Sequence, residues 1–515
     1  MISDHEFKKI TDKMLQMEAT YTDLIFKEVE SLDCSLFETT DNLYSAIPEC
    51  STRIKKGDSW GGNKVTGWFK CSYTVTPSTQ GQKLYLCADT GALETLVFVN
   101  GKPHGVLANK VVIRTRGNHH ALIITDGVKE GTTFDFALEA YCWHNEVGTQ
   151  PFKDEPNGPF NANHPVVFNS VTIALRDEVI KEFAFSLRAV NEIAQFTRDD
   201  YKRAEAQNCL YDIYKTVSQV PLESGVDYPA LKRALERMNL ILKKKNLSDN
   251  YPTMYITGHS HLDTAWLWPI KETIRKAART YSNAITMMKE YPEYTFLQSS
   301  ACHADMMKKY YPTIFEDIKR MVAEGRWEPN GGVWIECDCN VTGPEAMVRQ
   351  FLYGQRFTMK EFGYKSDTFW LPDTFGYSQS LPQIMKHSGV KNFCTTKMSW
   401  NDTNVFPWDT FNWQGIDGTA VLANLIDIQM GPTPKWAYTA LYEKKRGTRI
   451  SNLRYNSYGY GDGGAGPSYD LIELGRITED IEGVPRVKYS SISSYMDRLR
   501  MEAYEIPNYR GEIYL

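Results

Sequence analysis

Two histidines and an aspartate occupy alternate positions in the stretch GHSHLDTAWLWP, residues 258–269. They are His259, His261 and Asp263, and they closely follow MYITG, a run typical of a β-strand. Residues two apart on an extended backbone point the same way, so His261 and Asp263 can present a nitrogen and an oxygen to one ion. Such a pair suits zinc or a similar divalent cation. We interpret His259 as a core histidine and not as a third ligand.

Further carboxylates follow other predicted strands. Asp373 ends the run TFWLPD, Asp462 lies in the glycine-rich turn SYGYGDGGAGP, and alternation in GGVWIECDCN places Glu336 and Asp338 on one side. Each feature alone has an ordinary explanation, such as a helix N-cap for Asp373 or a turn residue for Asp462. In parallel α/β proteins the loops after the strands converge, so several such groups together favour a reaction centre.

The elements that would position these groups fall into four segments. Residues 1–34 predict an N-terminal helical segment, because apolar side chains recur every three or four positions. Residues 35–180 carry short alternating runs and the hairpin signal VNGKPHG, which are typical of an antiparallel β-sandwich. Residues 181–250 predict a helical linker. Over 251–515 strands alternate with helices, which predicts a parallel sheet, open or closed into a barrel.

Composition narrows the classes of function. The chain has 58 Lys and Arg against 63 Asp and Glu, a net charge of -5, so we expect no nucleic-acid partner. No apolar run approaches the roughly 18 residues of a membrane span. The first residues, MISDHEFKKITDKMLQ, lack the apolar run of a signal peptide. The 10 cysteines follow no framework spacing, so we expect reduced thiols and a cytoplasmic protein without a membrane partner.

Six motifs in the second half of the chain occur in a distinctive order. They are HLDTAWLWP, EGRWEPNGGVWIECDCN, VRQFLYGQRF, WLPDTFGYSQSLPQI, SWNDTNVFPWDTF and YGYGDGGAGP. Together they closely resemble glycoside hydrolase family 38, the metal-dependent retaining α-mannosidases, in its cytosolic and bacterial branch. The resemblance implies a multidomain α/β protein, in which an N-terminal β-sandwich and a helical linker precede a parallel (β/α)7-type barrel-like catalytic domain at 251–515.

The resemblance also implies a metal site and two catalytic carboxylates. His261, Asp263 and Asp373 would bind a divalent metal, zinc, which in this family contacts the 2- and 3-hydroxyls of mannose. Asp373 would also be the catalytic nucleophile, and Asp462 would be the general acid/base. A retaining glycosidase needs two such carboxylates about 5–5.5 Å apart, one to attack the anomeric carbon and one to protonate the departing oxygen.

Four further residues are assigned to the substrate. Trp266 and Phe375 would flank the bound sugar, and Lys397 stands where the family has a basic sugar contact. Asp338 is assigned to substrate binding with them. The substrate implied is a mannose-containing oligosaccharide, and a homo-oligomer is compatible with these features.

One departure from the family pattern leaves other functions open. The family has a further metal-binding histidine in a downstream motif, whereas the last histidine here is His387, in a predicted helix. We therefore expect an N-terminal portion without the downstream helical bundle and C-terminal β domains. A metal-dependent deacetylase or amidohydrolase would use similar ligands but no nucleophilic carboxylate. A non-catalytic sugar-binding chain is the other alternative.

Overall fold

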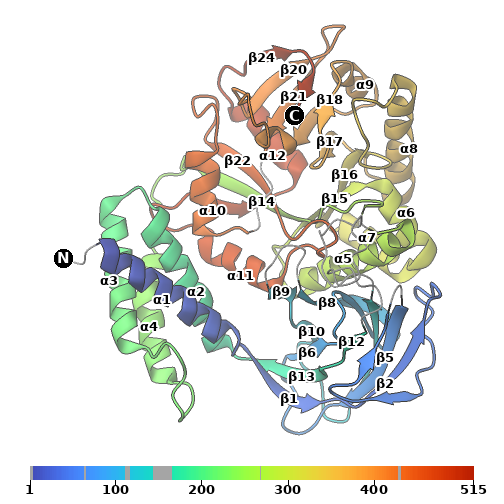
Figure 1. Cartoon of the computed structure of the whole chain (residues 1–515). Helices are drawn as coiled ribbons and strands as arrows, with labels where there is room; N and C mark the ends of the chain where they lie inside the picture. The colour runs from blue at the N-terminus through green and yellow to red at the C-terminus, as the bar shows by residue number, and fades with distance from the viewer. Residues whose placement is uncertain (1–3, 63–64, 111–115, 143–164, 267, 427–430) are drawn as a thin grey trace.

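The computed structural model describes residues 4–62, 65–110, 116–142, 165–266, 268–426 and 431–515. It is a mixed α/β protein with several sheets (Figure 1). Of the motifs above, only position 267 lies outside the described residues. No helix among the described residues has the length and apolar character needed to cross a membrane, and the cytoplasmic location stays a prediction.

The chain begins with α1 (Asp4–Thr22), where Ile10, Met14 and Met17 are buried at helical spacing. The helical prediction for residues 1–34 is wrong beyond this helix, because β1 (Phe26–Ser31) is a strand. Only Phe26 in β1 is partly buried, and the strand pairs with β13 through its backbone. Backbone pairing at a sheet edge leaves no alternating apolar pattern to find in the sequence.

The strands up to residue 176 form two large antiparallel sheets and one small one. The four-stranded sheet has the order β1, β13 (Ser170–Arg176), β6 (Leu84–Asp89), β10 (Leu122–Thr125). The seven-stranded sheet has the order β3 (Thr52–Ile54), β2 (Cys34–Thr39), β5 (Val65–Thr74), β11 (Thr133–Cys142), β7 (Thr95–Val99), β8 (Lys102–Lys110), β9 (Arg116–His119). The small sheet pairs β12 (Val166–Val167) with β4 (Ser59–Trp60). Leu86 and Ile173 of one large sheet share an apolar core with Val97 and Leu138 of the other.

The predicted hairpin lies between β7 and β8. Its two turn residues, Asn100 and Gly101, have φ of 50° and 77°. These values are those of a type I′ turn, which matches the twist of the paired strands. The Asn100 side-chain oxygen also accepts the backbone N–H of Asp135, which ties the turn to β11.

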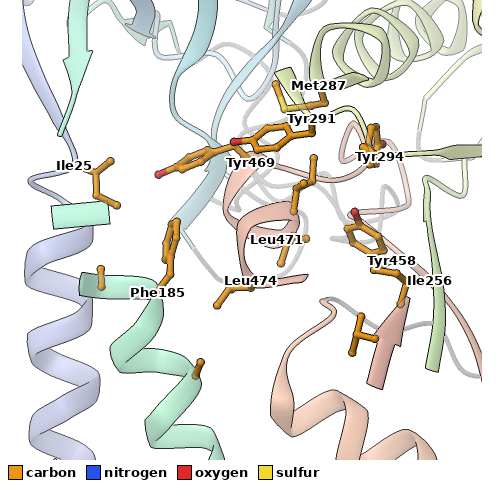
Figure 2. Close-up of a cluster of buried hydrophobic side chains, with 14 of the residues drawn as sticks. Ile25, Phe185, Ile256, Met287, Tyr291, Tyr294, Tyr458, Tyr469, Leu471 and Leu474 are labelled. Carbon is orange, nitrogen blue, oxygen red and sulfur yellow. The ribbon is translucent and has the colours of Figure 1, made fainter. Parts of the chain in front are cut away.

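Three helices follow the antiparallel sheets. They are α2 (Glu178–Phe196), α3 (Asp200–Thr216) and α4 (Tyr228–Leu242). The carboxylates of Asp177, Asp199 and Asp227 accept backbone N–H groups in the first turns of these helices, which is why each begins where it does. This segment is packed against the rest of the protein. Figure 2 shows Phe185 of α2 beside Leu471 and Leu474 of the downstream α11 (Tyr469–Thr478) in a shared core.

The residues after 252 form two mainly parallel sheets. One has the order β16 (Trp327–Val333), β15 (Phe296–Ser300), β14 (Thr253–His259), β22 (Leu453–Tyr458), and β23 (Arg486–Tyr489) also pairs with β14. The other has the order β17 (Thr368–Leu371), β19 (Asn392–Thr395), β21 (Ala420–Leu425), β20 (Thr410–Gln414), β24 (Asn508–Arg510). A separate pair joins β18 (Gly376–Tyr377) to β25 (Ile513–Tyr514).

Helices connect most of these strands. Besides α11 they are α5 (Ile270–Glu290), α6 (Ala301–Tyr310), α7 (Pro312–Ala323), α8 (Pro344–Phe362), α9 (Leu381–His387), η1 (Lys397–Ser399), α10 (Pro434–Tyr438), η2 (Thr439–Glu443) and α12 (Ile492–Glu502). The two sheets meet at β16 and β17, where the Asn330 side-chain oxygen accepts the backbone N–H groups of Asp367 and Thr368. A side chain replaces the backbone ladder at this junction, so the described strands form two sheets and not one.

Helix α5 is attached to the antiparallel sheets by buried ion pairs. Lys276 Nζ and Arg279 Nη1 lie 2.5 and 3.0 Å from the carboxylate of Glu94, just before β7. Arg275 Nε lies 2.9 Å from the carboxylate of Glu139 in β11. Removing one partner of such a pair leaves a buried charge uncompensated, so these contacts fix the seven-stranded sheet against α5.

Candidate active site

Polar side chains follow the carboxyl ends of five parallel strands: His261 and Asp263 after β14, Glu336 after β16, Asp373 after β17, Lys397 after β19 and Asp462 after β22. Three of these strands belong to one sheet, and β17 and β19 belong to the sheet that meets it at β16 and β17. The loops that follow the carboxyl ends of parallel strands converge at one edge. The structure therefore brings together groups that the sequence spreads over about two hundred residues.

The His261 imidazole lies at the centre of this group. Its Nε2 atom is 3.1 Å from an oxygen of Asp373 and 3.4 Å from an oxygen of Asp263, while its Nδ1 atom is 3.0 Å from Glu336. Burial alone would lower the pKa of His261, but the three carboxylates raise it well above its ordinary value. The carboxylates of Asp263 and Asp373 thus favour a positive charge at the Nε2 side of the ring, which a proton or a metal cation can supply.

Glu336 orients His261 from the side away from Asp263 and Asp373. Its other carboxylate oxygen accepts a hydrogen bond from Ser299 Oγ at 2.5 Å, so both oxygens are engaged. A carboxylate on one ring nitrogen fixes the tautomer and directs the second nitrogen outward, as in many metal sites. The alternation in the sequence placed Glu336 on the expected side of its segment, but no role was assigned to it.

Asp338 lies in the same segment and is exposed. Its carboxylate accepts the backbone N–H groups of Asn340 and Val341 at 2.9 and 2.7 Å, which is a local turn. The strand that precedes it ends at Val333, earlier than the sequence predicted. The assignment of Asp338 to the substrate therefore stays a prediction, and Glu336 is the residue of this segment that reaches His261.

Asp373 is held by a lysine as well as by His261. Lys397 Nζ lies 2.5 Å from its second carboxylate oxygen. Although burial would raise it, His261 and Lys397 lower the pKa of Asp373 to about 2. Lys397 Nζ also lies 3.3 Å from the ring centroid of Trp400 and 5.0 Å from that of Phe375. An ionised carboxylate in a fixed orientation is suited to nucleophilic attack or to metal binding.

Asp462 lies in a contrasting environment. Burial raises the pKa of its carboxyl above the ordinary value, and Asp263 and Asp373 add to this effect while His261 and Lys397 oppose it. Two carboxylates whose surroundings shift their pKa values in opposite directions can divide the roles of proton donor and ionised group. Asp373 and Asp462 meet this condition.

The donor set fits a divalent cation. His261, Asp263 and Asp462 offer one ligand atom each within 4.8 Å of one another, a set that shares two members with the predicted ligands but has Asp462 in place of Asp373. His261 Nε2 is buried between the carboxylates of Asp373 and Asp263, at 3.1 and 3.4 Å. A nitrogen surrounded by carboxylate oxygens is a typical site for zinc or a similar ion.

The aromatic residues assigned to the sugar are exposed, and Phe375 lies with Trp400 against Lys397. Trp266 is 48% exposed and Phe375 51%, and Trp400, which was not predicted to contact the sugar, is 64% exposed. Exposed aromatic faces next to a polar centre suit the apolar faces of a sugar ring. His259, in contrast, is buried, with Nδ1 bonded to the Leu297 carbonyl and Nε2 accepting from Trp370, as expected of a core histidine.

Comparison with known proteins identifies the class to which this fold and site belong. The profile of the glycosyl hydrolases family 38 N-terminal domain matches residues 252–512. The chain belongs to this family, which confirms the resemblance of the six motifs. Human alpha-mannosidase 2C1 is 31% identical over 473 residues, 89% of this chain and 43% of that protein. Alpha-mannosidase G of Dictyostelium discoideum is 30% identical over 463 residues, 89% of this chain and 41% of that protein.

The match to these relatives is partial in length. This chain spans less than half of each of the two curated relatives named above. Among solved structures, an alpha-mannosidase from Enterococcus faecalis V583 aligns over 51% of this chain and 31% of its own, with 19% identity and a TM-score of 0.43.

Proposed function

We propose that the protein is a retaining α-mannosidase that hydrolyses terminal α-mannosides of oligosaccharides. The observation that carries this proposal is the pair of carboxylates in opposite environments: Asp373 is bound by Lys397 and His261, and Asp462 is half-buried near His261 and Asp263. Family membership and the names of the curated relatives support the substrate class.

In this mechanism Asp373 attacks the anomeric carbon while Asp462 donates its proton to the departing glycosidic oxygen. The bond to the leaving group breaks, and a covalent mannosyl ester forms on Asp373. Asp462, now ionised, takes a proton from water, which attacks the same carbon and releases mannose with Asp373 regenerated. Lys397 keeps Asp373 ionised before attack, and Trp266 and Phe375 flank the sugar. Asp338 stays a candidate contact at the rim.

A divalent cation completes this proposal. His261, Asp263 and Asp373 would hold the ion, which we take to be zinc. When bound, the ion would supply a Lewis-acid contact to the 2- and 3-hydroxyls of mannose. Asp462 is the alternative third ligand, but a carboxylate that binds a cation is held ionised and is a poor proton donor. We therefore assign Asp462 to proton transfer.

The role of Glu336 can be tested by metal binding alone. Glu336→Gln keeps the size of the side chain but removes the charge that faces His261 Nδ1, so zinc affinity is expected to fall about 10–100-fold. Competition with a chromophoric chelator measures this without any substrate. Glu328→Gln is the matched control, because Glu328 is also buried on this segment but binds the backbone of Ile492 and Ser493. Equal losses in both variants would contradict the assignment.

The proposal also covers the domains into which the chain is divided. We assign catalysis to residues 251–515, with their parallel strands in a (β/α)7-type barrel-like arrangement around the site. Residues 1–34 would be the N-terminal segment, whose strand β1 pairs with β13 of a β-sandwich domain at 35–180, and residues 181–250 would be the helical connection. The site residues at the carboxyl ends of β14, β16, β17, β19 and β22 support this assignment, because barrel enzymes carry their reacting groups at that edge.

Covalent trapping tests the proposed reaction. The full-length protein is incubated with a fluorinated mannosyl fluoride, which forms the glycosyl ester quickly and hydrolyses it slowly. We expect one mannosyl label per protein, on the peptide that contains Asp373, identified by mass spectrometry. A deacetylase or amidohydrolase cleaves acyl bonds, which this probe lacks, and a sugar-binding chain cleaves nothing, so neither would acquire the label and its absence rejects the proposal.

A further inference from the structure

The loop that carries Asp462 is a narrow hairpin with a strained tip. Tyr460 and Gly466 close it with two backbone hydrogen bonds of 3.2 and 2.9 Å. Within it Asp462 and Ala465 have positive φ values of 53° and 66°, a conformation that is unfavourable for residues with side chains. Such a conformation persists only where neighbouring groups hold it. The position of the Asp462 carboxylate therefore depends on what the hairpin contacts.

Contacts from the α/β region hold mainly the base of this hairpin. Ser260 Oγ donates to the Tyr460 carbonyl at 3.0 Å. Asn283 of α5 donates to the carbonyls of Ala465 and Pro467 at 3.2 and 3.1 Å. These bonds fix both ends of the loop, whereas the turn around Gly463 and Gly464 is contacted by Lys276 of α5 and by a residue of the antiparallel sheets.

The tip is held by the antiparallel sheet that precedes the α/β region. His119, the last residue of β9, donates from Nε2 to the Gly464 carbonyl at 3.2 Å across 345 residues of sequence. The histidine is 4% exposed, and burial lowers its pKa to about 4, so the ring is neutral near pH 7. Its Nε2 must carry the hydrogen, because a carbonyl can only accept. Figure 1 shows β8 and β9 on the side of this sheet next to α5.

A second contact braces the same tip. A Cβ atom on Gly463 would lie 2.8 Å from Lys276 Nζ, so the loop packs directly against this lysine. Lys276 is fixed in turn by its 2.5 Å ion pair with Glu94 of the N-terminal sheet region. Two links therefore join the antiparallel sheets to the two residues that follow Asp462, one directly from His119 and one through Lys276 of α5.

We propose that His119 is a positioning residue for the candidate acid/base Asp462, so that the N-terminal sheet takes part in proton transfer. This inference rests on the proposed role of Asp462. Without the bond to Gly464, the tip would sample other conformations and the carboxyl group would spend less time within reach of the leaving oxygen. The chemistry at Asp373 would be affected less, because β17 and Lys397 hold that residue from another sheet.

Substrates of different leaving-group ability test this in the full-length protein. His119→Phe keeps a buried ring but removes the donor, and we expect it to slow mannobiose hydrolysis about tenfold more than 2,4-dinitrophenyl mannoside hydrolysis, which needs little proton donation. His119→Gln retains an N–H donor and should recover part of this loss. His104→Phe is the matched control, since His104 has the same lowered pKa of about 4 but bonds the Ile123 carbonyl within its own sheets.

A second measurement separates this inference from the proposed function. Hydrogen exchange of the backbone amides in residues 459–467 is expected to rise in His119→Phe and not in His104→Phe. If the wild-type protein failed to hydrolyse mannosides, the proposed function would fall while the exchange still reported on the loop. Unchanged exchange in His119→Phe, or equal rate losses on both substrates, would overturn the positioning role. His119→Ala replaces the phenylalanine variant if that variant does not fold.

Discussion

Asp373→Ala is expected to lower the hydrolysis of aryl α-mannosides by about 10⁴-fold or more, because a covalent mechanism loses its nucleophile. The effect should appear in kcat with every leaving group, since no substrate can form the mannosyl ester without this carboxylate. The fold should survive the change. The Asp373 side chain is 22% exposed, and its partners Lys397 and His261 keep other contacts to Trp400 and Glu336.

The measurement combines turnover with chemical rescue. Formate or azide can occupy the space left by the carboxylate and attack the sugar, which restores turnover of an activated substrate and inverts the product at the anomeric carbon. Asp417→Ala is the control, because Asp417 is an exposed aspartate whose carboxylate accepts hydrogen bonds from Thr419 in its own turn. Turnover of the Asp373 variant within tenfold of wild type would move the nucleophile to another residue.

Local signals in the sequence predicted much of the fold. The spacing of Ile10, Met14 and Met17 predicted α1, and Asn100-Gly101 predicted the β7–β8 hairpin, because both depend on residues close in sequence. The strand β1 was missed because its side chains are mostly exposed. The junction of the two parallel sheets could not be predicted either, since it depends on the Asn330 side chain meeting a backbone segment 37 residues away.

The candidate site was also predicted only in part. Strand ends and motifs predicted that His261, Asp373, Lys397 and Asp462 come together, because the convergence of parallel strands follows from topology. The contact partners of these residues were not predicted. Alternation in the sequence placed Glu336 and Asp338 on the same side of their segment and did not distinguish them. The structure shows that Glu336 contacts His261, whereas Asp338 accepts hydrogen bonds within a local turn.

Long-range supports of the site have no local signature at all. The bond from His119 to Gly464 joins an antiparallel strand to a loop of another segment, and neither residue type nor spacing in the sequence points to it. The carboxyl edge of parallel strands follows from the topology, whereas the support of one loop by a distant sheet depends on two residues that meet only in the folded chain. Sequence reasoning therefore finds the reacting groups more readily than the groups that hold them.

Asp462→Asn is expected to separate substrates by their leaving groups. A natural disaccharide needs a proton on its departing oxygen, so the glycosylation step should slow by about 10²–10⁴-fold, the usual contribution of a general acid. A dinitrophenyl mannoside leaves without a proton, so its glycosylation step should slow by about tenfold or less. Single-turnover kinetics with both substrates measures this step directly.

The same variant decides between the two roles open to this carboxylate. Its oxygen lies within 4.8 Å of ligand atoms on His261 and Asp263, so it could bind the cation in place of Asp373. In that case the asparagine would weaken zinc binding and slow both substrates alike, because the site would lose its ion whichever leaving group departs. If Asp462 is the acid/base, zinc affinity should stay within a few-fold of wild type while the two substrates diverge. Azide should then accelerate breakdown of the mannosyl ester, since an anionic nucleophile needs no general base and the loss of the Asp462 charge admits it beside the sugar.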